Sequence, residues 1–131
     1  MSQKPIELIL TRQLATYLAM PVFIVDPDGT LVFYNEPAER ILGRRFEETG
    51  EMPVEEWATA FAPTDDHGAP VPPETLPLRV TLTEHRPARS VFWITGFDGV
   101  RRRIETIAIP LLAAAGRDLG ALAIFWEPWA R

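Results

Sequence analysis

The segment from Pro21 to Gly43 constrains the fold most, because 23 consecutive residues carry the signals for two strands, a tight turn and a capped helix. Residues 22–25 and 31–34 are runs of β-branched and aromatic side chains, which favour strands. Between them, Asp26-Pro27-Asp28-Gly29 fits a type I turn, with the glycine in the left-handed bulge position. The pattern predicts a β-hairpin.

A short helix is predicted directly after the hairpin. Asn35 is a favoured N-cap, and Pro37 lies in the first turn, where a missing N–H does no harm. Because Pro37 has no N–H to give, we expect the Asn35 side chain to accept a hydrogen bond from the amide of Ala38. Gly43 is then the left-handed residue that ends the helix.

In its order and spacing this segment resembles the opening of the PAS family, which consists of small α+β sensor domains. The matching positions are Asp26, Gly29, Asn35, Ala38 and Gly43, followed downstream by Gly99, Pro110 and Gly120. The resemblance extends over about residues 18 to 127. It implies an α+β PAS fold, with a five-stranded antiparallel sheet, short helices on one face and an N-terminal amphipathic helix.

The remaining elements follow from periodicity and punctuation. Apolar residues recur at three- and four-residue spacing over residues 5–19, which predicts an amphipathic helix. Further helices are predicted at 54–61 and 77–84, and strands at 89–95, 101–112 and 119–126, whereas 44–53 and 62–73 are expected to be loops. We therefore divide the chain into a cap or dimerisation helix (1–19), a PAS domain (20–127) and a short tail (128–131).

Composition narrows the class of protein. With 131 residues, 47% hydrophobic and 24% charged, the chain is expected to form one soluble domain. The net charge of -5 argues against binding nucleic acid, and we interpret the basic run 101–103 as a solvated strand start. No stretch suggests a membrane span or a signal peptide, so a cytoplasmic location is expected. One lysine against 12 arginines suggests a bacterial genome rich in GC.

Catalytic and metal sites are not expected. The chain has no cysteine, and its two histidines, His67 and His85, lie in turn-like sequence without a partner for nucleophilic or acid–base chemistry. The side chains of Asp65-Asp66-His67 diverge, which disfavours a metal site. Haem is disfavoured because His85 is expected to be exposed rather than directed inward.

Flavin is disfavoured by the resemblance itself. Light-sensing PAS members need a cysteine, which this chain lacks, and flavin-binding members usually place amide side chains at positions resembling Ile94, Ile104 and Phe125. Apolar residues there would leave the polar edge of a flavin unpaired. No cofactor is therefore expected.

Strand alternation predicts which residues face the interior. With Pro110 as the register mark, the predicted pocket or core consists of Phe23, Val25, Trp57, Leu78, Leu82, Phe92, Ile94, Ile104, Thr106 and Phe125. Thr106 would be one of the few polar groups inside. Two alternatives stay open: a cavity for a small apolar ligand, such as a fatty acid or an aromatic metabolite, or a filled core.

A second set of residues is predicted to form a dimer face. The set combines the apolar stripe of the N-terminal helix with the outer sheet face, and contains Ile6, Ile9, Leu10, Leu14, Ile107, Ile109, Ile124 and Trp126. The helix is expected either to cover its own sheet or to pack against a second copy.

The family resemblance implies a sensory or regulatory module of signal transduction. It would sense a small apolar ligand and act as a homodimer or through a partner, such as a kinase or regulator of a two-component or transcriptional system. A ligand-free dimerisation or docking module is the alternative. Glu127 keeps an acidic position that ends many PAS domains, but Pro128 cannot continue a helix. The chain is therefore expected either to be part of a longer protein or to act in trans as a stand-alone domain.

Overall fold

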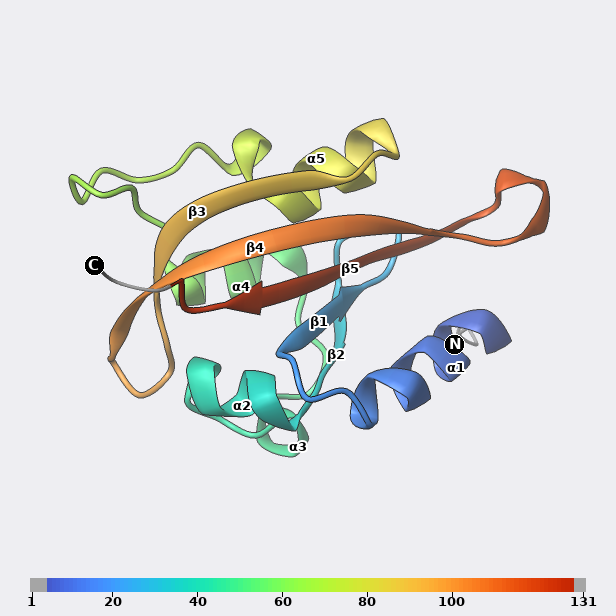
Figure 1. Cartoon of the computed structure of the whole chain (residues 1–131), viewed down its shortest axis with the longest axis horizontal. Helices are drawn as coiled ribbons and strands as arrows, with labels where there is room; N and C mark the ends of the chain where they lie inside the picture. Colours follow the sequence, from blue (N-terminus) through green and yellow to red (C-terminus); the bar gives the residue numbers. More distant parts are fainter. Residues whose placement is uncertain (1–4, 129–131) are drawn as a thin grey trace.

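The computed structural model describes residues 5–128 and contains one antiparallel sheet of five strands in the order β2-β1-β5-β4-β3 (Figure 1). The strands are β1 (Val22–Val25), β2 (Leu31–Tyr34), β3 (Ala88–Thr95), β4 (Arg101–Leu112) and β5 (Asp118–Trp126). The helices are α1 (Ile6–Thr16), α2 (Glu36–Leu42), α3 (Phe46–Thr49), α4 (Val54–Phe61) and α5 (Pro77–Glu84), with 3-10 turns η1 (Pro73–Thr75) and η2 (Ala114–Gly116). The predicted α+β class and five-stranded antiparallel sheet are confirmed.

The opening segment folds as its residues predict. The Gly29 amide donates to the Asp26 carbonyl oxygen at 2.9 Å, and Gly29 takes a φ of 86°, which places it in the left-handed region. Asn35 caps α2 by accepting from the Ala38 amide at 3.3 Å. Gly43 ends the helix with a φ of 80°.

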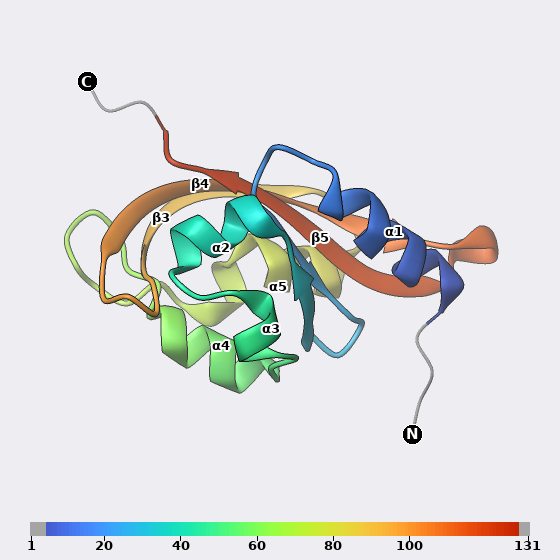
Figure 2. The same cartoon turned by 90° about the horizontal axis from the view of Figure 1, so that it is seen from below.

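The sheet separates two apolar clusters. Phe23 and Val25 of β1 point to the inner face, where α2, α4 and α5 pack, whereas Val22 and Ile24 point to the outer face and contact α1. Figure 2 shows α1 apart from helices α2 to α5. Alternation along each strand thus gives the domain an inner core and a separate outer layer.

The stretch 44–53, predicted as a loop, contains the short helix α3. The ring of Phe46 packs edge-to-face against Phe33 at 5.4 Å and against Tyr34 at 5.3 Å between centroids. The Tyr34 hydroxyl donates to the Arg44 carbonyl oxygen at 2.8 Å and lies 2.9 Å from Thr49 Oγ1. Tertiary contacts therefore hold a helix that is too short for a periodic sequence signal.

The N-terminal helix meets the sheet through a side other than its densest apolar stripe. Leu8 and Ala15 are buried against the outer sheet face, and the guanidinium of Arg12 lies 4.7 Å from the Phe33 ring centroid. A hydrogen bond helps to set which side of α1 faces the sheet. The Ala15 carbonyl oxygen accepts it from Asn35 Nδ2 at 2.9 Å.

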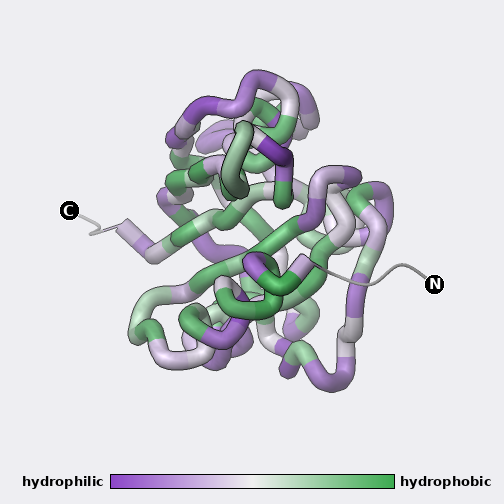
Figure 3. The backbone as a smooth tube through the Cα atoms, turned by 90° about the vertical axis from the view of Figure 1, so that its right-hand side faces the viewer, coloured by the Kyte–Doolittle hydropathy of each residue, from purple (hydrophilic) through white to green (hydrophobic). Residues whose placement is uncertain are grey.

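The predicted apolar stripe of α1 consequently points to solvent. Its members Ile6, Ile9, Leu10 and Leu14 are 50 to 68% exposed. In Figure 3, much of the tube in the first turns after the grey N-terminal trace is green, which marks these hydrophobic residues.

The residues of the predicted dimer face outside α1 lie in two places. Ile109 and Ile124 are half-buried against the cluster beneath α1. Ile107 and Trp126 are half-buried on the outer sheet face, where Arg89 lies over the Trp126 ring. Residues 1–4 of the predicted helical part and 129–131 of the predicted tail lie outside the described residues.

Candidate functional site

A cavity of about 70 Å³ lies in the inner cluster, between the sheet and the helices. It is lined by Phe23, Leu42, Trp57, Phe61, Pro63, Leu76, Pro77, Leu78, Phe92, Ile94, Ile104, Thr106, Ala123 and Phe125. The walls are almost wholly apolar, and no lining residue carries a charge. Such a space suits an apolar guest.

The structure brings eight of the ten predicted pocket residues to this cavity. The other two lie elsewhere: Val25 is fully buried in the inner core away from the cavity wall, and Leu82 is half-buried against that core. Ala123, two residues before Phe125 on the same face of β5, lines the cavity too.

Sequence reasoning missed five lining residues: Leu42, Phe61, Pro63, Leu76 and Pro77. Phe61 could have been found, because it follows Trp57 by four residues on one helix and so shares its face. Pro63 and Leu76 lie in connections without periodicity, so no sequence signal pointed to them.

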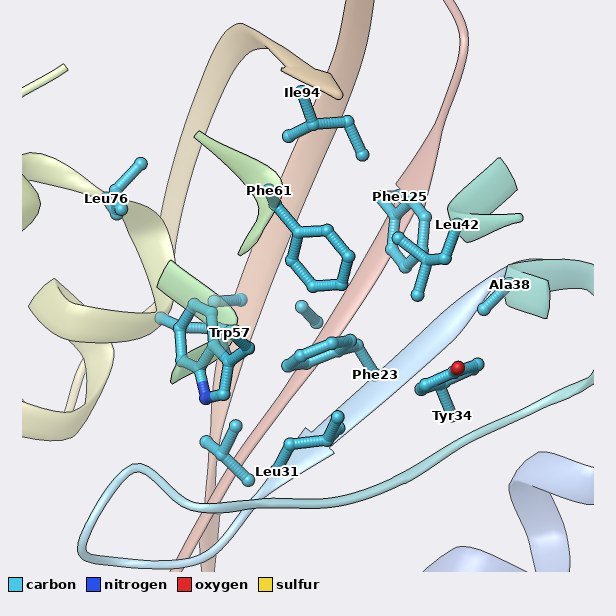
Figure 4. Packing of buried hydrophobic residues seen from close by; sticks show 14 of the residues in the cluster. Phe23, Leu31, Tyr34, Ala38, Leu42, Trp57, Phe61, Leu76, Ile94 and Phe125 are labelled. Carbon is cyan, nitrogen blue, oxygen red and sulfur yellow. The ribbon is translucent and has the colours of Figure 1, made fainter. Parts of the chain in front are cut away.

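Aromatic rings form much of the wall. The Phe23 ring meets the Trp57 ring edge-to-face at 5.4 Å and the Phe61 ring at 6.3 Å, measured between centroids (Figure 4). The indole N–H of Trp57 donates to the Gly29 carbonyl oxygen at 2.9 Å. This bond fixes Trp57 and leaves its one polar atom without capacity for a guest.

Thr106 is the polar exception in the cavity wall. Its side chain is buried, with 5% exposure. Among the described residues, Thr106 Oγ1 is the one buried side-chain oxygen or nitrogen atom that has no hydrogen-bond partner. Thr81, also buried, provides a contrast, since its hydroxyl reaches the carbonyl oxygens of Arg86 at 2.9 Å and Ala108 at 3.3 Å.

The connection from α4 to η1 closes one side of the cavity and is fastened to β3. Thr64 and Trp93 exchange two backbone hydrogen bonds, of 2.9 and 2.8 Å. Asp66 accepts from Trp93 Nε1 at 2.8 Å and from Arg103 Nε at 3.1 Å. These two hydrogen bonds hold the pKa of Asp66 below its usual value.

The basic run 101–103 is not simply the solvated strand start that was predicted. Arg102 is partly buried and donates to the Ile41 carbonyl oxygen at 2.8 Å, while its guanidinium pairs with Asp98 at 3.5 Å and Glu127 at 3.3 Å. The end of α2, the β3–β4 turn and the end of β5 thus meet at one side chain.

The structure places the residues considered for haem, metal and flavin binding as follows. His85 lies after α5 with a φ of 54°, is exposed, and places Nε2 at 3.4 Å from Asp118 rather than in the cavity. Within residues 5–128, no three histidine, aspartate or glutamate side chains gather as a metal site would require. The three positions weighed for flavin, Ile94, Ile104 and Phe125, all line the cavity with apolar side chains.

The part of the chain that the structure describes contains no helix with the length and apolar character to cross a membrane.

The fold and the sequence both match known proteins. The PAS domain of a protein from Colwellia psychrerythraea is similar with a TM-score of 0.65 and 18% identity, over 92% of this chain and 96% of that chain. The PAS domain of BvgS from Bordetella pertussis gives 0.64 and 16%, over 95% of this chain and 88% of that chain. The LOV protein of Rhodobacter sphaeroides gives 0.72 and 13%, over 95% and 69%.

At these identities the solved structures show the fold alone, and no curated protein matches the chain. The sequence itself matches the family model described as the PAS fold over residues 17–131. That match spans the hairpin, the capped helix and all five strands described above, and the chain therefore belongs to the PAS family.

Proposed function

We propose that this domain is a cytoplasmic sensory module of signal transduction that reports the occupancy of its inner cavity by a small apolar ligand. PAS domains are generally sensory and non-catalytic. PAS domains of BvgS and of nitrogen regulation protein NR(II) from Vibrio parahaemolyticus are among the similar structures, which favours a kinase or regulator as partner. The observation that carries the proposal is the uncharged cavity between sheet and helices.

No haem, flavin or metal forms part of the proposal. A flavin would find apolar side chains at Ile94, Ile104 and Phe125, and its polar edge would lose hydrogen bonds at about 1–3 kcal/mol per buried group. His85 lies outside the cavity wall, so it supplies no axial ligand there.

Ligand binding to the purified protein tests the proposal. We expect benzene or toluene to raise the melting temperature, because a guest that binds only the folded state stabilises it. Ala123→Leu, which adds three carbons to the wall, should remove this effect. Ala60→Leu, on the exposed side of α4, is the matched control and should keep it.

The proposal fails if neither probe shifts the melting temperature and organic extraction with mass spectrometry finds no co-purified molecule. If Ala123→Leu does not fold, Ala123→Val adds less volume and makes the same comparison.

A dimerisation module is a second candidate function, favoured by the exposed stripe on α1. Four large apolar side chains of one short helix are at least half exposed: Ile6, Ile9, Leu10 and Leu14. A second copy of the chain offers the same stripe, and two such helices can pair about a two-fold axis. The two candidates are compatible, because the stripe and the cavity lie on opposite faces of the sheet.

Light scattering tests the dimer. We expect the mass of a dimer at high protein concentration, and the mass of a monomer for Leu10→Glu, which places a charge in the centre of the stripe. Glu55→Lys, an exposed charge change on α4, should leave the dimer intact. A monomer at all concentrations, unchanged by Leu10→Glu, excludes this arrangement.

A further inference from the structure

We infer that the cavity selects a neutral single-ring aromatic molecule with one hydroxyl group, a phenol, and that this hydroxyl hydrogen-bonds to Thr106 Oγ1. The inference rests on the proposed sensory function and adds the chemical class of the ligand. It depends on four observations: the unpartnered hydroxyl, the absence of charge, the aromatic walls and the small volume.

The Thr106 hydroxyl suggests a ligand because it is buried and has no hydrogen-bond partner within the fold. Buried polar groups are nearly always hydrogen-bonded, and an orphan destabilises the fold. Thr81 shows that this fold can satisfy a buried threonine from backbone carbonyls. Thr106, on β4 opposite Phe125, instead lines the cavity with a side chain whose hydroxyl has no partner in the fold.

Water is a poor occupant of this space. A buried water needs two to four polar partners, and an apolar cavity without them stays dry. The indole N–H of Trp57 donates to the Gly29 carbonyl oxygen. Thr106 is therefore the side chain of the lining whose polar group can still form a hydrogen bond. A guest with an apolar body and one polar group satisfies Thr106 without leaving other groups unpaired.

The ligand is neutral because the lining contains no cation or anion. A buried carboxylate or ammonium without a partner is strongly unfavourable. The head group of a fatty acid therefore has no place beside Thr106, and of the two ligand classes considered from the sequence the aromatic one remains.

The walls and the volume favour a single ring. Five of the lining side chains are aromatic: Phe23, Trp57, Phe61, Phe92 and Phe125. Rings pack well edge-to-face against other rings, as Phe23 and Trp57 already do. The 70 Å³ cavity is about half of the roughly 150 Å³ that accepts benzene in an apolar protein core, so even one ring needs an expansion of the cavity and a larger ligand is disfavoured.

A ring of this size enters only if one wall moves outward. The sheet side is fixed by the antiparallel hydrogen bonds of β1, β5, β4 and β3, whereas the helix side includes Phe61 and Pro63 around Ala62, a non-glycine residue with a φ of 43°. We expect the connection after α4 to move outward when the ligand binds, so that this movement reports binding.

Isothermal titration of phenol and toluene into the wild type and Thr106→Val tests the inference. Valine has a similar shape and no hydroxyl. The ratio of the phenol and toluene dissociation constants should shift by about tenfold against phenol in Thr106→Val, the equivalent of one hydrogen bond. Thr106→Ser keeps the hydroxyl and should retain most of the wild-type ratio.

Melting temperatures of the ligand-free variants provide an independent readout. Thr106→Val should melt at a higher temperature than the wild type because it removes an orphan hydroxyl, whereas Thr81→Val should melt at a lower temperature because it removes a hydroxyl that donates to backbone carbonyl oxygens. If Thr106→Val does not fold, Thr106→Ala replaces it in the titrations.

The outcomes separate the inference from the proposed function. Binding of both probes with an unchanged ratio in Thr106→Val overturns the phenol assignment and leaves the apolar sensor standing. Failure of both probes to bind the wild type overturns the sensor itself, and the phenol assignment with it.

Discussion

A side chain at position 120 would have no room, because an added Cβ would collide with the Val25 carbonyl oxygen and approach Asp26 Cα at 2.8 Å. Gly120 also has a φ of 114°, a conformation that other residues rarely adopt. Among the glycines predicted from the family resemblance, Gly120 has the clearest physical reason: the start of β5 must pass close to the end of β1.

Gly120→Ala should therefore reduce the free energy of unfolding by at least about 3 kcal/mol. Gly116→Ala is the matched control, since Gly116 has a φ of 72° but nothing within 4 Å of its added Cβ, so only the backbone penalty of about 1 kcal/mol applies. Urea denaturation measures both variants. Equal losses would mean that close approach is not what selects glycine at position 120.

Residues were predicted best where their own chemistry dictates the backbone. Gly29 and Gly43 take left-handed conformations that the absence of a side chain permits, and Asn35 caps α2 with its side chain. Thr106 was expected inside, but its missing partner could not be foreseen, because hydrogen bonding depends on which carbonyl groups the tertiary fold brings near.

At the scale of elements, the connection between α4 and η1 depends on a small set of polar contacts. The Asp66 carboxylate accepts from Trp93 and Arg103, and both bonds favour its charged form. Because the pKa of Asp66 is lowered in the folded state, the stabilisation is fully present above the unfolded pKa of about 4 and is lost as the pH falls through the folded value.

Hydrogen exchange checks this connection. At pH 7, Asp66→Ala should speed exchange of the Thr64 and Trp93 amides, which form the bridge to β3. As the pH falls through the folded pKa of Asp66, which lies below its usual value, the wild type and the variant should converge. Glu74→Ala, an exposed carboxylate in η1, is the control and should leave both amides unchanged. A difference that persists undiminished in acid would contradict the role of the carboxylate.

Periodicity and turn signals predicted most helices and strands. They could not predict features that depend on contacts between distant parts of the chain. Periodicity located the apolar stripe of α1 but left open what it packs against. In the structure this stripe points to solvent, while Leu8 and Ala15 contact the sheet. Helix α3 is held by Phe46 against rings of β2, a long-range contact that no local pattern encodes.

For the molecule as a whole, Asn35 is the link between its two layers. Its Oδ1 accepts from the Val22 and Ala38 amides, and its Nδ2 donates to the carbonyl oxygens of Ala15 and Met20. Three of these bonds reach the end of α1, the connection after it and the start of β1, and the fourth caps α2. A change at this side chain is felt by both apolar clusters.

Asn35→Ala should reduce the free energy of unfolding by about 2–4 kcal/mol, since it leaves buried backbone groups without partners. Asn35→Asp should also be destabilising, because it keeps the acceptor but places a carboxylate oxygen against two carbonyl oxygens. Thr16→Ala, an exposed change in α1, should alter stability by less than about 0.5 kcal/mol. A loss under 1 kcal/mol in Asn35→Ala would show that α1 is held by packing alone.

The backbone bridges also decide how this molecule can associate. The outer strands of a sheet ordinarily offer free N–H and C=O groups to which another chain can add. Here Met52 exchanges two backbone bonds with Leu31 on β2, and Thr64 does so with Trp93 on β3. A loop thus occupies part of each edge, and growth of the sheet by strand addition is discouraged at both ends. Association is directed to the faces of the domain, where side chains rather than main-chain groups choose the partner.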